Sequence, residues 1–231
     1  MPNRRRQTKA QSYKEEKEIS KVRVVNKLRP RTQNQANYIR TMVENDIIFC
    51  SGPPGAGKDF CSIGLACEYL INNKYKKIVI TRPTIEVGST LSALPGTVFE
   101  KVFPFMAPIL DTLEFFLGKT ELEHHMKFKT IEIVPLQYMR GLTFWNSFIV
   151  VDECQDATRT QLLAALTRLG SNSKMVLLGD EHQSDLPIHA QGAFSNCMIK
   201  LQNVNGIGIS KLEVSDIQRS QIVKEIVERL Y

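Results

Sequence analysis

The chain has 231 residues and a mass of 26.2 kDa, which allows one large domain or two small ones and excludes peptide hormones and large multidomain machines. Hydrophobic residues make up 42% of the chain and charged residues 23%, so it can bury a sizeable core. The longest apolar runs have the length of a strand, far short of the roughly 20 residues that a membrane-spanning helix needs. We therefore expect no contact with a membrane.

The cysteines and the N-terminal sequence both bear on where the protein works. Five cysteines form no C-x-x-C pair, and their number is odd, which argues against a disulfide framework or a zinc site. The N-terminus is rich in arginine, but no apolar stretch follows it, so we expect no secretory signal. Together these features favour a reducing, cytoplasmic setting.

The formal net charge of +6 is concentrated near the N-terminus. Residues 1–30 contain ten of the 30 lysines and arginines but three of the 24 acidic residues. We expect a basic, flexible tail over residues 1–29, followed by one domain over residues 30–231. Such a tail can bind nucleic acid by neutralising phosphates, or it can serve only as a solubilising end.

Helical and strand patterns alternate along the rest of the chain. In chain order we expect a helix over 33–44, a strand over 47–50, a helix over 59–72 and a strand over 77–81. A long loop and a helix over 98–117 follow, and Pro104 and Pro108 should kink or split that helix. Further strands are expected over 131–134, 148–151, 174–180 and 207–212, with helices over 160–169, 193–200 and 220–230. The helix over 160–169 should bury Leu162, Leu163, Leu166 and Leu169 on one face.

This order of elements predicts an α/β fold: a mostly parallel sheet covered by helices on both faces. In such sheets, ligands bind at the carboxyl ends of the strands. Three of the expected strands lead into Gly52, Asp152 and Asp180. A single nucleotide could therefore touch all three strand ends.

A glycine-rich turn after the first strand matches the pattern G-x-x-x-x-G-K of a phosphate-binding loop. Its residues are Gly52, Pro53, Pro54, Gly55, Ala56, Gly57, Lys58 and Asp59. The glycines let backbone N–H groups converge on phosphate oxygens, and Lys58 can reach the β- and γ-phosphates of ATP. Asp59 stands where such loops usually carry a Ser or Thr that ligates Mg²⁺. Its carboxylate can still hold the ion, but it adds a negative charge beside the phosphates.

The strand over 148–151 leads into two adjacent carboxylates, as in a Walker-B motif. Asp152 would anchor Mg²⁺, and Glu153 would orient and polarise the attacking water as a general base. Taken alone, an acidic strand end is more often a turn or a helix cap. Its position downstream of a phosphate loop in the same α/β chain favours the catalytic interpretation.

A third polar segment follows the strand over 174–180. Gln183 in this segment can hydrogen-bond a phosphate or the attacking water, and so sense whether ATP has been hydrolysed. An ordinary polar turn is the structural alternative.

Several blocks in this sequence, taken in order, resemble the PhoH family of phosphate-starvation-inducible ATPases. The resemblance covers about residues 30–231 and rests on the segments 32–39, 81–88, 94–96, 138–141, 152–155 and 179–187, together with the phosphate loop. The PhoH family is in turn similar to the first RecA-like half of superfamily 1 helicases. The resemblance thus implies a single RecA-like P-loop NTPase domain that binds ATP and Mg²⁺. Cores of this length are also similar to copies encoded by bacteriophages.

The resemblance also implies roles for residues outside the two main motifs. Gln35 lies where the family has a glutamine that reads the adenine edge. Arg82 lies where related motors contact the nucleic-acid backbone or couple it to the nucleotide. Arg219 matches a late arginine that would contact the γ-phosphate in cis or act as an arginine finger in trans. A surface salt bridge is the alternative for Arg219.

We expect from these features a Mg²⁺-dependent ATPase that couples hydrolysis to binding or remodelling of RNA or single-stranded DNA. No second RecA-like domain is recognisable, so a neighbouring subunit would complete the nucleotide site in a ring, which the resemblance suggests is a hexamer. Two alternatives stay open: a nucleotide-dependent oligomeric scaffold with weak turnover, which Asp59 motivates, and a small-molecule P-loop kinase.

Overall fold

The computed structural model describes residues 25–83 and 103–230 of the chain. Within these ranges a six-stranded sheet has the order β3-β2-β4-β5-β1-β6, and every pairing is parallel. The strands are β1 (Ile47–Ser51), β2 (Lys77–Thr81), β3 (Ile131–Ile133), β4 (Ser147–Val151), β5 (Lys174–Gly179) and β6 (Ile207–Lys211). The predicted parallel α/β fold is confirmed.

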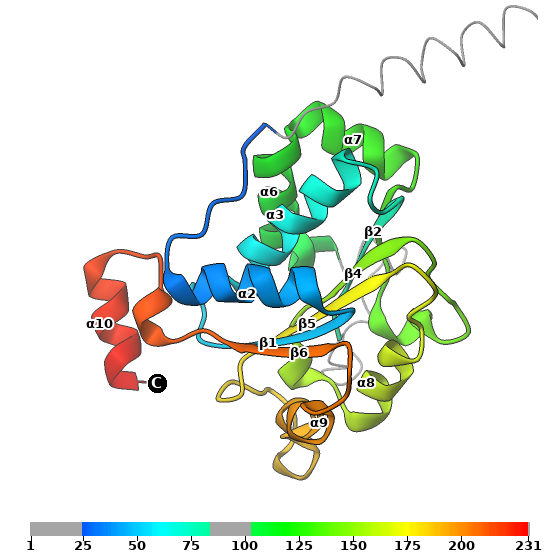
Figure 1. Cartoon of the computed structure of the whole chain (residues 1–231). Coiled ribbons are helices and arrows are strands. Elements are labelled where there is room, and N and C mark those ends of the chain that lie inside the picture. The colour runs from blue at the N-terminus through cyan, green and yellow to red at the C-terminus, as the bar shows by residue number, and fades with distance from the viewer. Residues whose placement is uncertain (1–24, 84–102, 231) are drawn as a thin grey trace, which may run out of the picture.

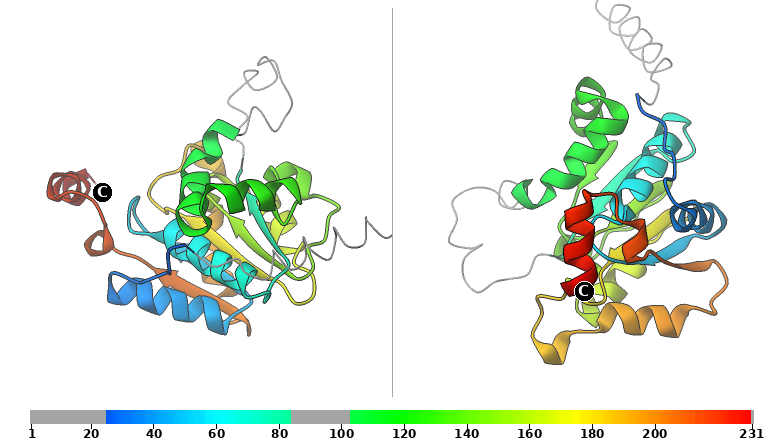
Figure 2. Two further views of the ribbon diagram at one scale, coloured as in Figure 1. Left: turned by 90° about the horizontal axis from the view of Figure 1, so that it is seen from above. Right: turned by 90° about the vertical axis from the view of Figure 1, so that its left-hand side faces the viewer.

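Helices cover both faces of the sheet (Figures 1 and 2). One face carries α2 (Gln33–Glu44), α3 (Lys58–Ile71), α6 (Ala107–Leu117) and α7 (Lys119–Lys127), and the other carries α8 (Arg159–Leu166) and α9 (Ala193–Leu201). The last helix, α10 (Gln221–Leu230), lies at the outside of the molecule and buries none of its residues. Short 3₁₀ turns occupy 103–106, 136–139, 154–156, 188–190 and 214–216.

The central strands β1, β4 and β5 are buried almost throughout, because each strand has helices above and below it. Two apolar clusters result. One contains Phe148 and Ile48 under α2, α3 and α6, and the other contains Phe49 and Ile149 over α8 and α9. Neighbouring residues thus point to opposite faces of one sheet, as the pleat requires. Among the described residues, no helix combines the length and the apolar character needed to cross a membrane.

Three helical segments can be compared in detail with the sequence expectations. The segment expected as a helix over 98–117 is a 3₁₀ turn over Phe103–Met106 followed by α6, which confirms the predicted split; residues 98–102 lie outside the described ranges. The helix α7 is absent from the expected elements because it is short, polar and separated from α6 only by Gly118. The helix α8 ends at Leu166 instead of residue 169, and its Leu163 is 60% exposed. Leu162 and Leu166 are four residues apart and share a face, whereas Leu163 lies about 100° around the helix.

Residues 25–29, which the sequence places in the basic tail, lie against the folded domain. The Val25 amide donates to Phe116 O at 2.8 Å, and the Leu28 amide donates to Glu68 Oε1 at 3.1 Å. Leu28 also packs on the apolar cluster beneath α3 and α6. This segment therefore runs along the domain before it enters α2 (Figure 1).

Candidate functional site

The phosphate loop connects β1 to α3 in a conformation that depends on its glycines. Gly55 and Gly57 have φ angles of 80° and 95°, in the left-handed region that glycine adopts without strain. Lys58 is the first residue of α3, and its Nζ donates to Gly52 O at 2.5 Å and to Pro53 O at 3.1 Å. The lysine amine is thus held over the loop, at the positive end of a helix.

Gln35 supports the phosphate loop from the side of α2. Its side chain is 3% exposed; Nε2 donates to Ala56 O at 2.9 Å, and Oε1 accepts from the Arg31 amide at 2.8 Å. A Cβ atom on Gly57 would lie 2.7 Å from Gln35 Nε2. The structure therefore places this glutamine against the loop backbone, with both of its polar ends engaged.

The two Walker-B carboxylates follow β4 directly, next to the phosphate loop. The Glu153 residue has a φ of 51°, and its amide donates to Asp152 Oδ1 at 2.8 Å. This left-handed turn sends the two neighbouring carboxylates in different directions. A non-glycine residue in that conformation is uncommon, and such residues are concentrated at functional sites.

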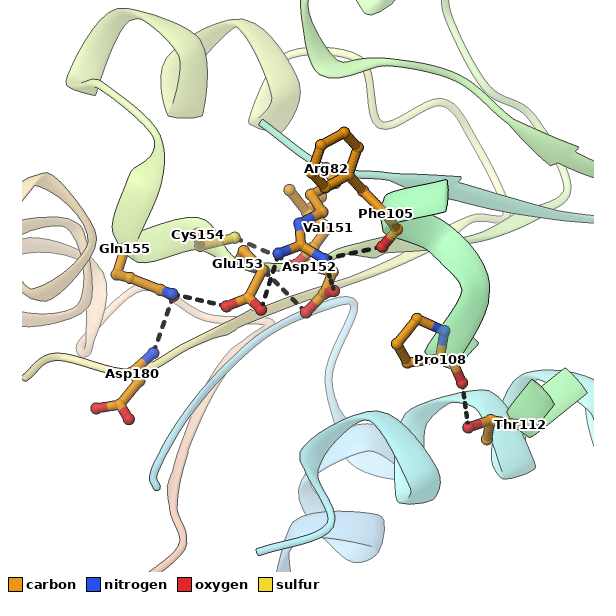
Figure 3. A network of polar contacts seen from close by, with 10 residues as sticks. All are labelled: Arg82, Phe105, Pro108, Thr112, Val151, Asp152, Glu153, Cys154, Gln155 and Asp180. Carbon is orange, nitrogen blue, oxygen red and sulfur yellow. Dashed lines mark hydrogen bonds and ion pairs between the residues drawn. The ribbon is translucent and has the colours of Figure 1, made fainter. Parts of the chain in front are cut away.

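Arg82, which the family resemblance assigns to nucleic acid, lies against both carboxylates (Figure 3). Its Nη2 is 3.2 Å from Glu153 Oε1, and its Nη1 is 3.9 Å from Asp152 Oδ2. Nη1 also donates to Phe105 O at 3.0 Å, which ties the end of β2 to the 3₁₀ turn before α6. The guanidinium therefore extends from the end of β2 to the two carboxylates that follow the neighbouring strand β4.

Gln155 is a site residue to which the sequence patterns assign no role. Its Nε2 donates to Glu153 Oε2 at 2.6 Å, and its Oε1 accepts from the Asp180 amide at 3.0 Å (Figure 3). The side chain thus bridges the ends of β4 and β5, which are neighbours in the sheet. Its place in the segment 152–155, one of the blocks on which the family resemblance rests, is a sequence signal. The segment alone does not indicate which atoms the side-chain amide contacts.

Asp59 and Asp152 form a close acidic pair beneath the loop. Burial raises the pKa of both carboxyl groups; the nearby charge of Glu153 raises both further, while Lys58 lowers that of Asp59. Asp59 Oδ1 is buried and meets no hydrogen-bond donor among the described residues. A buried carboxylate oxygen that has no donor and lies beside a second carboxylate is suited to bind a divalent cation.

The pair fits Mg²⁺ better than it fits a metal caged by protein alone. Mg²⁺ is commonly held by one or two carboxylates together with phosphate oxygens and water. Within the described ranges, no group of three or more His, Cys, Asp or Glu residues is arranged to hold a metal. Asp59 and Asp152 can therefore supply two ligands, while a bound triphosphate would supply others.

Arg219 approaches the phosphate loop of its own chain. The Gln218 amide donates to Gly55 O at 3.0 Å, and a Cβ atom on Gly55 would lie 3.2 Å from Arg219 Cγ. This contact places the segment before α10 against the phosphate loop. Among the described acidic residues, none forms a salt bridge with Arg219.

These groups line one cavity of about 510 Å³. Of the residues singled out in the sequence, its lining includes Gln35, Pro54, Gly55, Gly57, Lys58, Asp59, Arg82, Asp152, Glu153, Gln183 and Arg219. Gly52, Pro53 and Ala56 are buried and support the loop from behind. The opposite wall comes from α6 and the turn before it, with Phe105, Asp111 and Thr112. No motif pointed to that wall, because its residues are ordinary helix-surface residues brought here by the chain fold.

A parallel sheet with a phosphate loop after β1 and paired carboxylates after β4, which is separated from β1 by the single strand β5, defines a P-loop NTPase fold of the RecA-like type. The sequence matches the family described as PhoH-like protein over residues 27–231. The chain therefore belongs to the PhoH family.

Curated relatives agree with this assignment. A PhoH-like protein of Synechocystis sp. is 39% identical over 210 residues, which are 91% of this chain and 64% of the relative. A PhoH-like protein of Bacillus subtilis is 38% identical and covers 92% of this chain and 67% of the relative. Protein PhoH of Escherichia coli is 32% identical, with shares of 83% and 55%. The chain thus spans between about half and two thirds of the length of these relatives.

Solved structures show the same fold at low sequence identity. The large terminase of a thermophilic bacteriophage is 13% identical, covers 88% of this chain and 51% of the terminase, and has a TM-score of 0.53. The same terminase in complex with ADP has the same TM-score, with shares of 87% and 50%. At this identity the likeness shows the fold alone.

Proposed function

We propose that this chain binds ATP with Mg²⁺ and hydrolyses it, and that hydrolysis is coupled to binding of RNA or single-stranded DNA. One observation carries the proposal: Lys58, Asp152 and Glu153 lie around a single cavity together with Gln183 and Arg219. Each of these groups has a distinct task in phosphoryl transfer, which is catalysed mainly by positioning and charge.

The phosphate loop and Lys58 would bind the β- and γ-phosphates, because they present backbone N–H groups and an ammonium at the start of α3. Mg²⁺, held by Asp59 and Asp152, would neutralise charge that develops on the phosphate oxygens. Glu153 would accept a proton from the attacking water. Gln183 lies on the wall after β5, where its amide can hydrogen-bond water or the γ-phosphate.

Arg82 would couple the nucleotide cavity to nucleic acid. Its guanidinium pairs with Glu153 at 3.2 Å, and a carboxylate held by an arginine is not free to orient the attacking water. A phosphate of a bound strand could attract the guanidinium away from Glu153. This arrangement would keep turnover slow until nucleic acid binds.

A second candidate function is a nucleotide-dependent oligomeric scaffold with weak turnover. Asp59 supports it, since its carboxylate lies beside Asp152 where a neutral hydroxyl is usual. Repulsion between the acidic pair and the phosphates would slow turnover without preventing binding.

Release of ADP and phosphate, measured with and without single-stranded RNA or DNA, tests the proposal. We expect hydrolysis that needs Mg²⁺ and rises when a strand is added. ATP binding without hydrolysis under every condition would favour the scaffold. A hydrolysis rate that does not rise when a strand is added would contradict the proposed coupling to nucleic acid.

We further propose that subunits associate into a ring, a hexamer by analogy with the family. The apolar face of α10 supports self-association, because Ile222, Ile226 and Leu230 are 67%, 49% and 84% exposed. Sedimentation of the full chain measures the assembly, and Ile226→Asp should reduce it. An assembly of unchanged size in that variant would contradict the involvement of α10.

A further inference from the structure

A second cleft adjoins the nucleotide cavity and has a different chemical character. It has a volume of about 570 Å³ and lies between residues 25–31 and the helices α3 and α6. Its cationic walls come from Lys27, Arg29 and Arg31, and its aromatic walls come from Phe60 and Phe115. Among the described residues, no aspartate or glutamate lines it. The cleft therefore combines positive charge with aromatic surface.

The three cations are arranged along one side of the chain. They follow each other at every second residue, all three are exposed, and all three face the same cleft. Within the described ranges, none of their side chains forms a hydrogen bond or a salt bridge. Four residues of extended chain span up to about 14 Å, so three cations spaced in this way can contact more than one phosphate of a strand.

The backbone that carries this row is fixed to the domain. The Val25 amide bonds to Phe116 O, Asn26 Nδ2 donates to Phe115 O at 2.7 Å, and Leu28 packs inward. The chain then enters α2 at Gln33. The cations are thus held in place along the cleft at little further cost in backbone entropy.

The aromatic side of the cleft presents an open ring. Phe115 is 46% exposed, and its ring lies 5.6 Å from that of Phe60 at an angle of 50°. An exposed aromatic ring beside a row of cations is the combination that proteins use for single-stranded nucleic acid: bases stack on the ring and phosphates track the charges.

We propose that this cleft binds a segment of single-stranded nucleic acid, with phosphates along Lys27 and Arg29 and a base stacked on Phe115. The inference rests on the proposed function, because it names the surface at which the strand would bind. A free nucleotide would need fewer cations, and the phosphates of ATP have their own site at Lys58. Arg31 and Phe60 line both cavities, so a bound strand would touch the wall of the nucleotide site.

The test is fluorescence anisotropy of a labelled 12-nucleotide oligouridylate against the full chain without ATP, over a range of salt concentrations. Lys27→Ala/Arg29→Ala should weaken binding and reduce the log–log salt slope by about 1.4, which corresponds to about 0.7 for each lost phosphate contact on a single strand. Lys76→Ala/Lys200→Ala removes the same charge from two exposed lysines outside the cleft. This control should leave both quantities unchanged.

Variants of Phe115 separate stacking from charge. Phe115→Leu should weaken binding about 5-fold to about 150-fold, the range that loss of one stacked base produces, at an unchanged salt slope. Phe115→Trp keeps an aromatic surface and should retain binding. Circular dichroism, measured on every variant, identifies any variant that has failed to fold, and ATP binding is measured alongside strand binding.

Four outcomes are decisive. Weaker strand binding with a smaller salt slope, seen in Lys27→Ala/Arg29→Ala and not in the lysine control, supports the proposal. Equal binding by the cleft variants and the lysine control would overturn it and leave the proposed function in place. Loss of ATP affinity at unchanged strand affinity would assign the cleft to the nucleotide and also overturn it. Failure of the unmodified chain to bind any strand would contradict the proposed function itself.

Discussion

Gln155 donates a hydrogen bond from Nε2 to Oε2 of Glu153 over 2.6 Å. The same side chain accepts the amide of Asp180 at 3.0 Å, so the proposed general base is oriented by a residue anchored to the next strand. Gln155 is 7% exposed, and its backbone oxygen accepts from Ser184 Oγ at 3.0 Å. These contacts link the Walker-B turn to the segment that carries Gln183.

Gln155→Ala should lower kcat by up to about 10²-fold, because a displaced general base loses the geometry that proton transfer needs. The KM for ATP should change little, since Gln155 does not line the nucleotide cavity. Steady-state kinetics separate the two constants. A variant that raises KM but leaves kcat unchanged would contradict the positioning role.

Lys58 and Glu153 should show different defects. Lys58→Ala should weaken ATP binding by about 10-fold to about 150-fold, the usual range for lost hydrogen bonds to a charged group. Glu153→Gln should keep ATP binding and lower the hydrolysis rate by about 10²- to 10⁴-fold. Binding of a fluorescent ATP analogue and release of phosphate measure the two effects. Similar losses of binding in both variants would contradict the assignment.

Asp59 should make the folded protein less stable as the pH rises. Burial raises the pKa of Asp59 above its ordinary value, so the folded protein holds a proton that the unfolded chain releases. The free energy of unfolding then falls as the pH rises from the unfolded pKa through the folded one. Without Mg²⁺ at pH 8, Asp59→Asn should increase Tm by about 2 to 4 °C, the shift that about 1 kcal/mol produces in a domain of this size.

Added Mg²⁺ should stabilise the unmodified chain more than Asp59→Asn, because the variant lacks one of the two carboxylates. Thermal unfolding at pH 5 and pH 8, with and without Mg²⁺, gives both comparisons. Asp111→Asn is the control, since Asp111 is an exposed carboxylate that lines the same cavity. An equal increase in Tm for Asp111→Asn would contradict the prediction for Asp59. An increase in Tm for Asp59→Asn that is larger at pH 5 than at pH 8 would also contradict it.

Arg219 should act within its own chain. It lines the cavity of the same subunit and lies against Gly55, so Arg219→Ala should lower kcat by on the order of 10³-fold. Mixing Arg219→Ala subunits with Lys58→Ala subunits should restore no activity, because no site in the mixture has both groups from one chain. Recovery of activity in mixtures with demonstrated subunit exchange would show that the arginine acts in trans.

The succession of strands and helices along the chain, except for α7, could be read from the sequence alone, as could the phosphate loop and the paired carboxylates. Each is a local signal: apolar runs mark buried strands such as β4, and the G-x-x-x-x-G-K spacing marks the loop. Parallel strands place their carboxyl ends at one edge, so the meeting of Lys58 with Asp152 and Glu153 also followed from sequence.

The partners of individual side chains were decided by the tertiary structure. Arg82 pairs with Glu153 because β2 and β4 are neighbours in the sheet, and Gln155 bridges to Asp180 because β4 and β5 are. The wall from α6 and the row of cations beside Phe115 depend on how segments distant in sequence pack together. The spacing of residues along the chain predicts local conformation. These contacts depend instead on strand order and helix packing, and no single segment of the sequence determines either of them.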